Sequence, residues 1–147
     1  MTLSVGDILP KATLLRLAES GPEQVDLAAR LRDHKVVIFG LPGAFTPTCS
    51  SAHVPSFIRT ADRFRAAGVS DIFCIAVNDV HVMRLWGEQT GGSAAGIAFL
   101  ADADSAFTTA IGMQFDAPVG GFFARSKRYS MLVEDGTVKL LNTEVSR

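Results

Sequence analysis

Cys49 stands where a short apolar segment gives way to a segment with helical periodicity. The run Val-Val-Ile-Phe at 36–39 is unbroken and too short for a helix, so it predicts a strand buried on both faces. Beyond the cysteine, apolar residues at 54, 57, 58, 61 and 64 recur at a helical spacing. The pattern therefore places Cys49 at the junction of a buried strand and a helix.

The residues before Cys49 suit the start of that helix. Thr46 is a favoured N-cap type, and Pro47 then occupies the first helical position, where its missing N–H costs nothing. Cys49 falls in the first turn, among unpaired backbone N–H groups at the positive end of the helix dipole. A free thiol has a pKa of about 8.5, which falls to roughly 3.5–7.5 in such settings. The sequence thus predicts an activated thiolate and thiol chemistry.

Size and composition describe one ordinary globular domain over residues 1–147. Hydrophobic residues make up 48% of the chain and charged residues 20%, which excludes a disordered protein. The formal net charge of −1 gives no reason to expect a nucleic acid or an anionic membrane as partner. The two cysteines, Cys49 and Cys74, form no C-x-x-C pair and predict neither a disulfide framework nor a zinc finger.

The start of the chain, Met-Thr-Leu-Ser-Val-Gly-Asp, lacks a basic stretch followed by an apolar one. No apolar run is long enough to cross a membrane. We therefore expect a reducing interior, by default the cytoplasm.

Strands and helices are predicted to alternate along the chain. Continuous apolar runs predict two further buried strands, at 72–77 and 97–101. Apolar residues at helical spacing predict helices at 25–31, after a turn at Gly21-Pro22, between Asn78 and Gly91, and at 104–111. In the second of these, Asn78 is the expected cap, and Val82, Leu85 and Trp86 the expected inward stripe.

The helix after Cys49 is expected to end near Ala67, with Gly68 as its stop. Pro55 inside it removes one hydrogen bond and predicts a kink, the alternative being a helix boundary. Residues 113–126 have no clean period and predict a long loop, of a kind that is often functional.

Asp135-Gly136 lies between β-rich runs at 129–134 and 137–141 and predicts a hairpin. Strands that alternate with helices need a sheet covered on both sides. The whole order predicts an α/β protein with a thioredoxin-like fold, a central mixed sheet flanked by helices.

The motif Pro42-x-x-x-Thr46-x-x-Cys49 resembles the peroxidatic motif of peroxiredoxins. The longer run at 42–57 is similar to the class-five, or type II, subfamily. The similarity continues through 74–79, 85–87, 100–102 and 125–131, so it covers nearly the whole chain. The resemblance implies a thiol peroxidase.

The resemblance also assigns roles, beginning with Cys49 as the peroxidatic nucleophile. The matching Thr46 orients the peroxide and the thiolate, a role compatible with an N-cap. Pro42 shields the thiolate from water and overoxidation, and its alternative is a plain turn former. Arg128 supplies a fixed cation to the thiolate and the developing oxyanion, and we prefer it to Arg125 for this role. Alternatively, the basic cluster at 125–128 is a solvent-exposed surface without a catalytic role.

Gly43, Phe45 and Thr48 of the same motif are the expected substrate-binding residues. Phe45, with Phe122 and Phe123, gives an apolar surround that suits alkyl hydroperoxides as well as hydrogen peroxide.

His53, at i+4 from Cys49, could lower the thiol pKa or accept its proton. We favour a structural role, because the resemblance carries a histidine here without a catalytic one. Cys74 lies in a predicted buried strand, where burial as a small hydrophobe competes with a role as resolving cysteine. A metal site built from Cys49, His53, Cys74 and His81 would need spacings that the sequence lacks.

Two functions fit these residues. In the first, the Cys49 thiolate attacks hydrogen peroxide or an alkyl hydroperoxide and becomes a sulfenic acid, and water or an alcohol leaves. This chemistry requires no metal, haem or flavin. An external thiol then regenerates the enzyme, glutathione with glutaredoxin first and thioredoxin next. In the second, the chain is a redox-sensing module in which Cys49 reports oxidation to a partner.

Members of the resembled subfamily normally continue beyond Leu141 into a helix that packs on the sheet, and this chain ends at Arg147. We therefore expect an apolar face of the sheet to be partly open. We also expect a homodimer, since the loops with Phe45, Trp86 and Phe115 hold large apolar groups whose solvation would leave an exposed patch. The resemblance points to a face around the active site as the contact.

Overall fold

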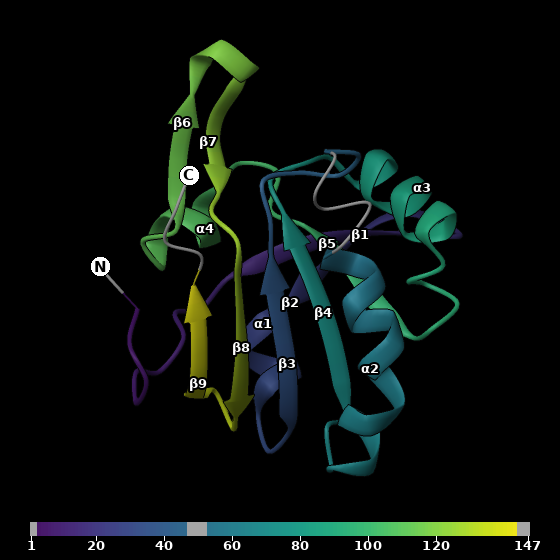
Figure 1. Cartoon of the computed structure of the whole chain (residues 1–147), viewed down its shortest axis with the longest axis vertical. Coiled ribbons are helices and arrows are strands. Elements are labelled where there is room, and N and C mark those ends of the chain that lie inside the picture. The colour runs from purple at the N-terminus through teal and green to yellow at the C-terminus, as the bar shows by residue number, and fades with distance from the viewer. Residues whose placement is uncertain (1–2, 47–52, 144–147) are drawn as a thin grey trace.

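In the computed structural model of the chain, which describes residues 3–46 and 53–143, seven strands form one mixed sheet (Figure 1). In spatial order these strands are β2 (Gly21–Asp26), β1 (Thr13–Ala18), β5 (Ile97–Ala101), β4 (Asp71–Ala76), β3 (Lys35–Gly40), β8 (Tyr129–Glu134) and β9 (Thr137–Thr143). A separate two-stranded sheet consists of β6 (Gln114–Ala117) and β7 (Phe122–Ser126). The helices are α1 (Leu27–Leu31), α2 (Val54–Ala66), α3 (Val80–Thr90), α4 (Ala106–Ala110) and the short 3₁₀ helix η2 (Pro118–Gly120).

Strand β3 lies at the centre of the sheet, as its unbroken apolar run predicts. It pairs in parallel with β4 and antiparallel with β8, and its residues 36–40 are all buried. The parallel pairing continues from β4 to β5. A strand covered on both faces needs apolar side chains at every position, so these three runs lack the alternation of a half-exposed strand.

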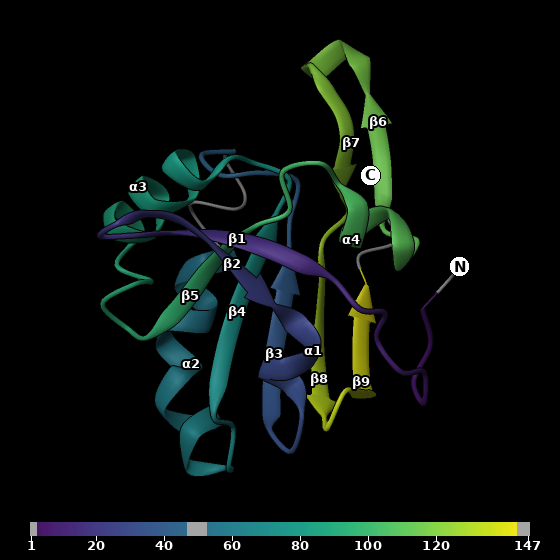
Figure 2. The same ribbon diagram turned by 180° about the vertical axis from the view of Figure 1, so that it is seen from behind.

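Two hydrophobic clusters, one on each face of the sheet, hold the helices. Helices α2 and α3 contribute Val54, Phe57, Met83 and Trp86 to one cluster. Helices α1 and α4 contribute Leu27, Leu31 and Phe107 to the other, on the face seen in Figure 2. The expected thioredoxin-like arrangement of a mixed sheet flanked by helices is therefore confirmed. No helix in the described part of the chain is long and apolar enough to cross a membrane.

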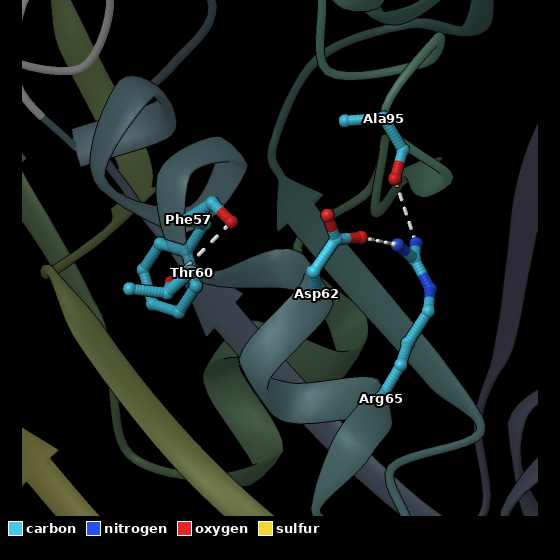
Figure 3. A network of polar contacts seen from close by, with 5 residues as sticks. All are labelled: Phe57, Thr60, Asp62, Arg65 and Ala95. Atoms are coloured by element: carbon cyan, nitrogen blue, oxygen red, sulfur yellow. Dashed lines mark hydrogen bonds and ion pairs between the residues drawn. The ribbon is translucent and has the colours of Figure 1, made fainter.

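Helix α2 is tied at its C-terminal end to the loop before β5 (Figure 3). Arg65 Nη2 donates to the Ala95 carbonyl at 2.7 Å, and Nη1 lies 3.5 Å from Asp62 Oδ1. The helix ends at Ala66 and Gly68 follows with φ +96°, the stop that the sequence predicts. At the other end Pro55 lies in the first turn described, where a missing N–H costs nothing. The kink expected there depends on residues 47–52, which lie outside the described part.

The N-terminal segment contains a hairpin that was not predicted from the sequence. Strands β1 and β2 pair antiparallel along their whole length, and Val25, expected in a helix, lies in β2. Helix α1 begins only at Leu27, with Asp26 as its cap. The hairpin forms an edge of the sheet, and most residues of β2 are exposed. An edge strand of this kind carries too few buried positions to produce a clear period.

Helix α3 faces the sheet with a stripe that contains the predicted Trp86 but not the predicted Leu85. Its buried residues are Val80, Met83, Trp86 and Gly87, whereas Leu85 is 48% exposed. Its N-cap is Asp79, whose carboxylate accepts from Val82 N at 2.9 Å. Asn78, the expected cap, lies one residue too early for this role.

Residues 113–126, predicted as a long loop, form the β6–β7 hairpin with η2 at its tip. The pairing register shifts between Phe115 and Ala117, and Ala124 has a φ of +52°. These irregularities explain why no period is visible in the sequence. The hairpin extends beyond one end of the main sheet (Figure 1).

The C-terminal hairpin β8–β9 forms as predicted, with Asp135 and Gly136 at φ +49° and +81°. No helix stands in front of these two strands in Figure 1, and Leu140 of β9 is 60% exposed. The apolar face is thus partly open in the described part of the chain, as expected.

Candidate active site

The candidate site begins at Gly40, where β3 ends. Residues 41–43 stay buried, and the chain becomes more exposed at Phe45. Cys49 and Thr48, the expected nucleophile and one expected substrate-binding residue, lie outside the described residues. The site is therefore built from the loop at 41–46 and from the elements that contact it.

Thr46 folds back on the loop. Its hydroxyl donates to the Gly43 carbonyl oxygen at 2.8 Å, and its backbone N–H points at the same oxygen at 3.4 Å. Because the hydroxyl gives its proton to a carbonyl, its lone pairs are available to accept a hydrogen bond from another group. The arrangement therefore leaves Thr46 able to accept a hydrogen bond from a ligand. The N-cap role predicted for it depends on residues outside the described part.

Phe45 sits in a strained backbone conformation. Its φ is +65°, in the left-handed region that a residue with a large side chain rarely adopts. Such a conformation costs about 1–3 kcal/mol and persists only where neighbouring structure imposes it. The side chain is 48% exposed and lies 6.4 Å, between ring centroids, from Trp86.

The loop is held from two sides. Arg125 Nη1 of β7 donates to the Pro42 carbonyl oxygen at 2.9 Å. On the other side, Asn78 at the end of β4 accepts from Ala44 N through Oδ1 at 2.9 Å. A Cβ built on Gly43 would overlap Arg125 Nη1, so any side chain here would have to displace the Arg125 guanidinium. Neither Asn78 nor Arg125 was predicted to contact the loop.

Arg128 lies between β7 and β8 and is half-buried. The next residue, Tyr129, pairs with Gly40, so Arg128 lies at the same end of the sheet as the loop. The structure therefore brings both arginines of the basic cluster to the candidate site. Arg125 contacts the loop directly, at the Pro42 carbonyl oxygen. The preference for Arg128 as the catalytic cation stays a prediction.

His53 belongs to an aromatic cluster at the start of α2. Its ring lies 5.3 Å from the Phe39 ring and 5.5 Å from the Phe57 ring, edge-on to both. Phe39 and Phe57 stack in parallel at 4.0 Å. This packing suits the structural role preferred for His53.

Cys74 is completely buried in β4, opposite Phe39 in the ladder with β3. Its distance from Cys49 is not defined by the described residues, so both roles considered for it stay predictions. The described residues contain no group of three or more His, Cys, Asp or Glu side chains that could hold a metal ion.

The aromatic residues expected around the substrate fall into two separate groups. Phe45 packs near Trp86, which is a core residue only 1% exposed. The expectation that Trp86 adds to an exposed patch is therefore wrong. Phe122 packs against Phe115 at 6.1 Å on the hairpin, and Phe123 is 64% exposed.

Tyr129, which the sequence reading did not single out, carries a buried hydroxyl with no hydrogen-bond partner among the described residues. Burial raises the pKa of this phenol far above its ordinary value, and the neighbouring Cys74 and Asp102 raise it further. Asp102 itself accepts from Phe107 N and Thr108 N at the start of α4. The phenol is therefore neutral and serves as part of the core beneath the site.

Comparison with known proteins identifies the family to which this fold belongs. A sequence model of the Redoxin family matches residues 4–147. Peroxiredoxin-2B of Arabidopsis thaliana is 38% identical, over 97% of this chain and 88% of that protein. Peroxiredoxin-2E-2, chloroplastic, of rice is 43% identical over 97% of this chain. The chain spans 65% of that protein and 62% of the chloroplastic peroxiredoxin-2E of Arabidopsis thaliana.

Solved structures give the same result. The structure of reduced Prx3 in complex with H₂O₂ from Vibrio vulnificus has a TM-score of 0.93 and 41% identity, covering 99% of this chain and 90% of that one. Peroxiredoxin 5 from Alvinella pompejana has a TM-score of 0.86 and 33% identity, covering 97% of this chain and 90% of that one. The fold and the loop after β3 thus define a thioredoxin-like protein of the redoxin class. Within that class, the chain belongs to the peroxiredoxin family, in its type II, or class-five, branch.

Proposed function

We propose that this chain is a thiol-dependent peroxidase that reduces hydrogen peroxide and alkyl hydroperoxides through Cys49. The observation that carries the proposal is the match to peroxiredoxins over almost the whole chain, motif included. The structure adds a second support, since Pro42 and Thr46 of that motif lie in a pinned loop at the end of β3.

The proposed reaction begins with the Cys49 thiolate, whose sulfur attacks one oxygen of the peroxide. A bond forms between sulfur and that oxygen while the O–O bond breaks. The leaving oxygen takes a proton and departs as water or an alcohol, and Cys49 becomes a sulfenic acid. The sulfur is oxidised by two electrons and the peroxide is reduced by two. A first thiol condenses with the sulfenic acid to a mixed disulfide and releases water, and a second thiol then attacks this disulfide, releases the Cys49 thiolate and forms a disulfide of the two reductant thiols.

We propose a part in this step for each of the predicted site residues. Thr46 accepts a hydrogen bond from the peroxide O–H, because its own hydroxyl already donates to the Gly43 carbonyl oxygen. Arg128 stabilises the thiolate and the charge that develops on the leaving oxygen. Pro42, which is buried, limits the access of water to the sulfur. Gly43, Phe45 and Thr48 line the approach of the substrate.

The reductant that we propose is glutathione with glutaredoxin, with thioredoxin as the alternative. Cys74 is buried in a central strand, which favours an external thiol over a disulfide between Cys49 and Cys74. Such a reductant belongs to a reducing compartment, and we propose the cytoplasm. Some relatives carry chloroplastic or mitochondrial names, so fractionation of the source cells is the direct test.

We also propose a homodimer with its contact near the active site. Phe45 and Leu85 are each 48% exposed, and Val119 and Phe123 of the hairpin are exposed more fully. Light scattering should give a dimer at micromolar concentration. A clean monomer under these conditions would contradict this part of the proposal.

The central test is stopped-flow oxidation of the reduced protein by hydrogen peroxide, compared with Cys49→Ser. The wild type should react quickly and turn over with a thiol reductant. The serine variant should keep its circular dichroism and lose peroxide consumption, because a serine hydroxyl is not ionised near neutral pH. Retained turnover in Cys49→Ser would overturn the proposal.

The second candidate is a redox sensor that passes its oxidation state to a partner through the open face around Leu140, which is 60% exposed. A sensor oxidises once and stalls, whereas a peroxidase turns over many times with glutathione and glutaredoxin or with thioredoxin. Steady-state peroxide consumption therefore separates the two functions.

A further inference from the structure

We propose that Arg125 is a positioning residue of the peroxidase, which fixes the active-site loop through the Pro42 carbonyl. The inference rests on the proposed function of the site. It gives Arg125 a task different from that of Arg128, which we expect to face the reacting atoms.

The contact between Arg125 and the loop is direct and specific. Nη1 donates to the Pro42 carbonyl oxygen at 2.9 Å, between residues far apart in the sequence. The guanidinium carbon also lies 5.3 Å from the centroid of the Phe122 ring, within the range of a cation–π contact. A planar guanidinium held by a ring on one side and a carbonyl on another has little freedom to move.

The backbone that carries Arg125 is itself anchored. Ala124 N donates to Asp116 Oδ1 at 2.7 Å, and the Ala124 carbonyl accepts from Ser105 Oγ at 2.7 Å. The φ of Ala124 is +52°, a conformation that these two bonds hold in place. The irregular hairpin β6–β7 therefore presents Arg125 to the loop from a fixed base.

Gly43 transmits this contact to Thr46. The peptide bond before Gly43 contains Pro42 O, which accepts from Arg125. The peptide bond after Gly43 contains Ala44 N, which donates to Asn78 Oδ1 at 2.9 Å. The carbonyl of Gly43 in turn accepts the Thr46 hydroxyl proton at 2.8 Å. A shift of Pro42 would therefore move the Gly43 carbonyl and rotate the hydroxyl that we expect to meet the peroxide. Misplacement of a reacting geometry by about 1 Å can cost roughly 10²-fold in rate.

The test compares two reactions of Cys49 in the same variants. Its peroxide reaction depends on the positioned groups of the loop, whereas alkylation by iodoacetamide depends on the thiolate fraction and on access. Arg125→Met keeps length and packing but removes the donor, and Arg125→Lys keeps one donor. Lys127→Met is the matched control, because Lys127 is exposed and lies two residues further along the chain. Gly43→Ala disturbs the same contact from the loop side.

We expect Arg125→Met to slow the peroxide reaction about 10- to 100-fold while alkylation stays within about twofold of the wild type. Arg125→Lys should recover part of the peroxide rate, Gly43→Ala should show the same selective loss, and Lys127→Met should change neither rate. Combining Arg125→Met with Asn78→Ala should cost less than the product of the single losses, because both residues hold one loop.

Two outcomes would overturn the inference. One is a peroxide rate in both Arg125→Met and Gly43→Ala within twofold of the wild type. The other is an equal fall of peroxide and alkylation rates, which would make Arg125 an electrostatic partner of the thiolate. If the wild type itself does not react with peroxide, it is the proposed function that fails, and this result is distinguishable from both.

Discussion

The ring of Tyr129 lies in the space that a side chain on Gly40 would occupy. The two residues are directly opposite in the β3–β8 ladder, and a Cβ on Gly40 would overlap the Tyr129 ring. Gly40 has no positive φ, so the requirement for glycine here comes from this close approach alone. Gly40 is also the last residue of β3, directly before the active-site loop. The packing of one aromatic ring therefore sets where the loop begins.

Gly40→Ala should destabilise the protein. Overpacking of a filled core costs typically about 1–3 kcal/mol, and the ring of Tyr129 is buried. Urea unfolding of the reduced protein measures the change. Gly120→Ala is the control, since a Cβ there meets only Phe122 at an ordinary 3.7 Å, and it should stay within about 0.5 kcal/mol. Equal stability of the two variants would contradict the prediction.

Tyr129→Phe should be neutral to stabilising at neutral pH. The phenol hydroxyl is buried without a partner among the described residues, and such a group costs about 1–3 kcal/mol when left unsatisfied. Removing it deletes that cost and keeps the ring against Gly40. A loss of more than about 1 kcal/mol in the variant would instead reveal a bonded hydroxyl.

The same residue predicts a loss of stability at alkaline pH. Burial raises the pKa of Tyr129 in the folded state, so above pH 10 the unfolded phenol releases its proton while the folded one keeps it. Stability is therefore fully present below pH 10 and falls as the pH rises further. The wild type should lose more stability than Tyr129→Phe between pH 9 and 11. Because the chain has one tyrosine, tyrosinate absorbance should appear only with unfolding.

The sequence predicted the centre of this fold better than its edges. The strands β3, β4 and β5 carry unbroken apolar runs because both faces of the sheet are covered, and a run of this kind is visible without any partner. The β6–β7 hairpin, in contrast, was predicted as a loop. Its register shifts between Phe115 and Ala117, and the carbonyl of Ala124, whose φ is positive, accepts from the distant Ser105 Oγ. No local period encodes them.

In the candidate site, too, some residues could be predicted from the sequence and others could not. Pro42, Thr46 and Cys49 form a motif of fixed spacing, so they could be predicted from the sequence alone. Asn78 and Arg125 reach the loop from other elements, and only the folded chain brings them to it. Asn78 was expected to cap α3. Asp79 is the cap instead, so the side-chain amide oxygen of Asn78 can accept from Ala44 N. A polar residue directly after a buried strand is the signal that could have indicated it.

Cys74→Ser should keep most peroxidase activity with glutathione and glutaredoxin. Cys74 is completely buried in β4, and we expect its thiol to serve as a small hydrophobe. The serine variant should be less stable than Cys74→Ala, because a hydroxyl is costly in an apolar site. Activity assays and thermal unfolding of both variants check these points. A large loss of activity in both, together with a Cys49–Cys74 bond in mass spectra of the oxidised protein, would make Cys74 the resolving residue.

Arg128 offers the sharpest test of the site assignment, because Arg125 lies in the same segment. If the Arg128 cation stabilises the thiolate and the developing oxyanion, Arg128→Ala should lower both the thiolate fraction of Cys49 at neutral pH and its peroxide rate. Loss of one preorganised donor to such a charge typically costs about 10²–10³ in rate. Arg128→Lys should not rescue fully, because a point charge does not reproduce the planar donor geometry.

Substitutions of the two arginines should therefore have different effects on the reactions of Cys49. Arg128→Ala should slow alkylation of Cys49 as well as its peroxide reaction, whereas Arg125→Ala should slow the peroxide reaction alone, and by less than Arg128→Ala does. Thiolate absorbance against pH, measured together with both rates, separates the variants. Should Arg125→Ala prove to be the crippled variant with a low thiolate fraction, and Arg128→Ala the healthy one, the catalytic cation is Arg125. In that case the hydrogen bond from Arg125 to Pro42 would hold the catalytic cation itself at the loop, in addition to supporting the loop.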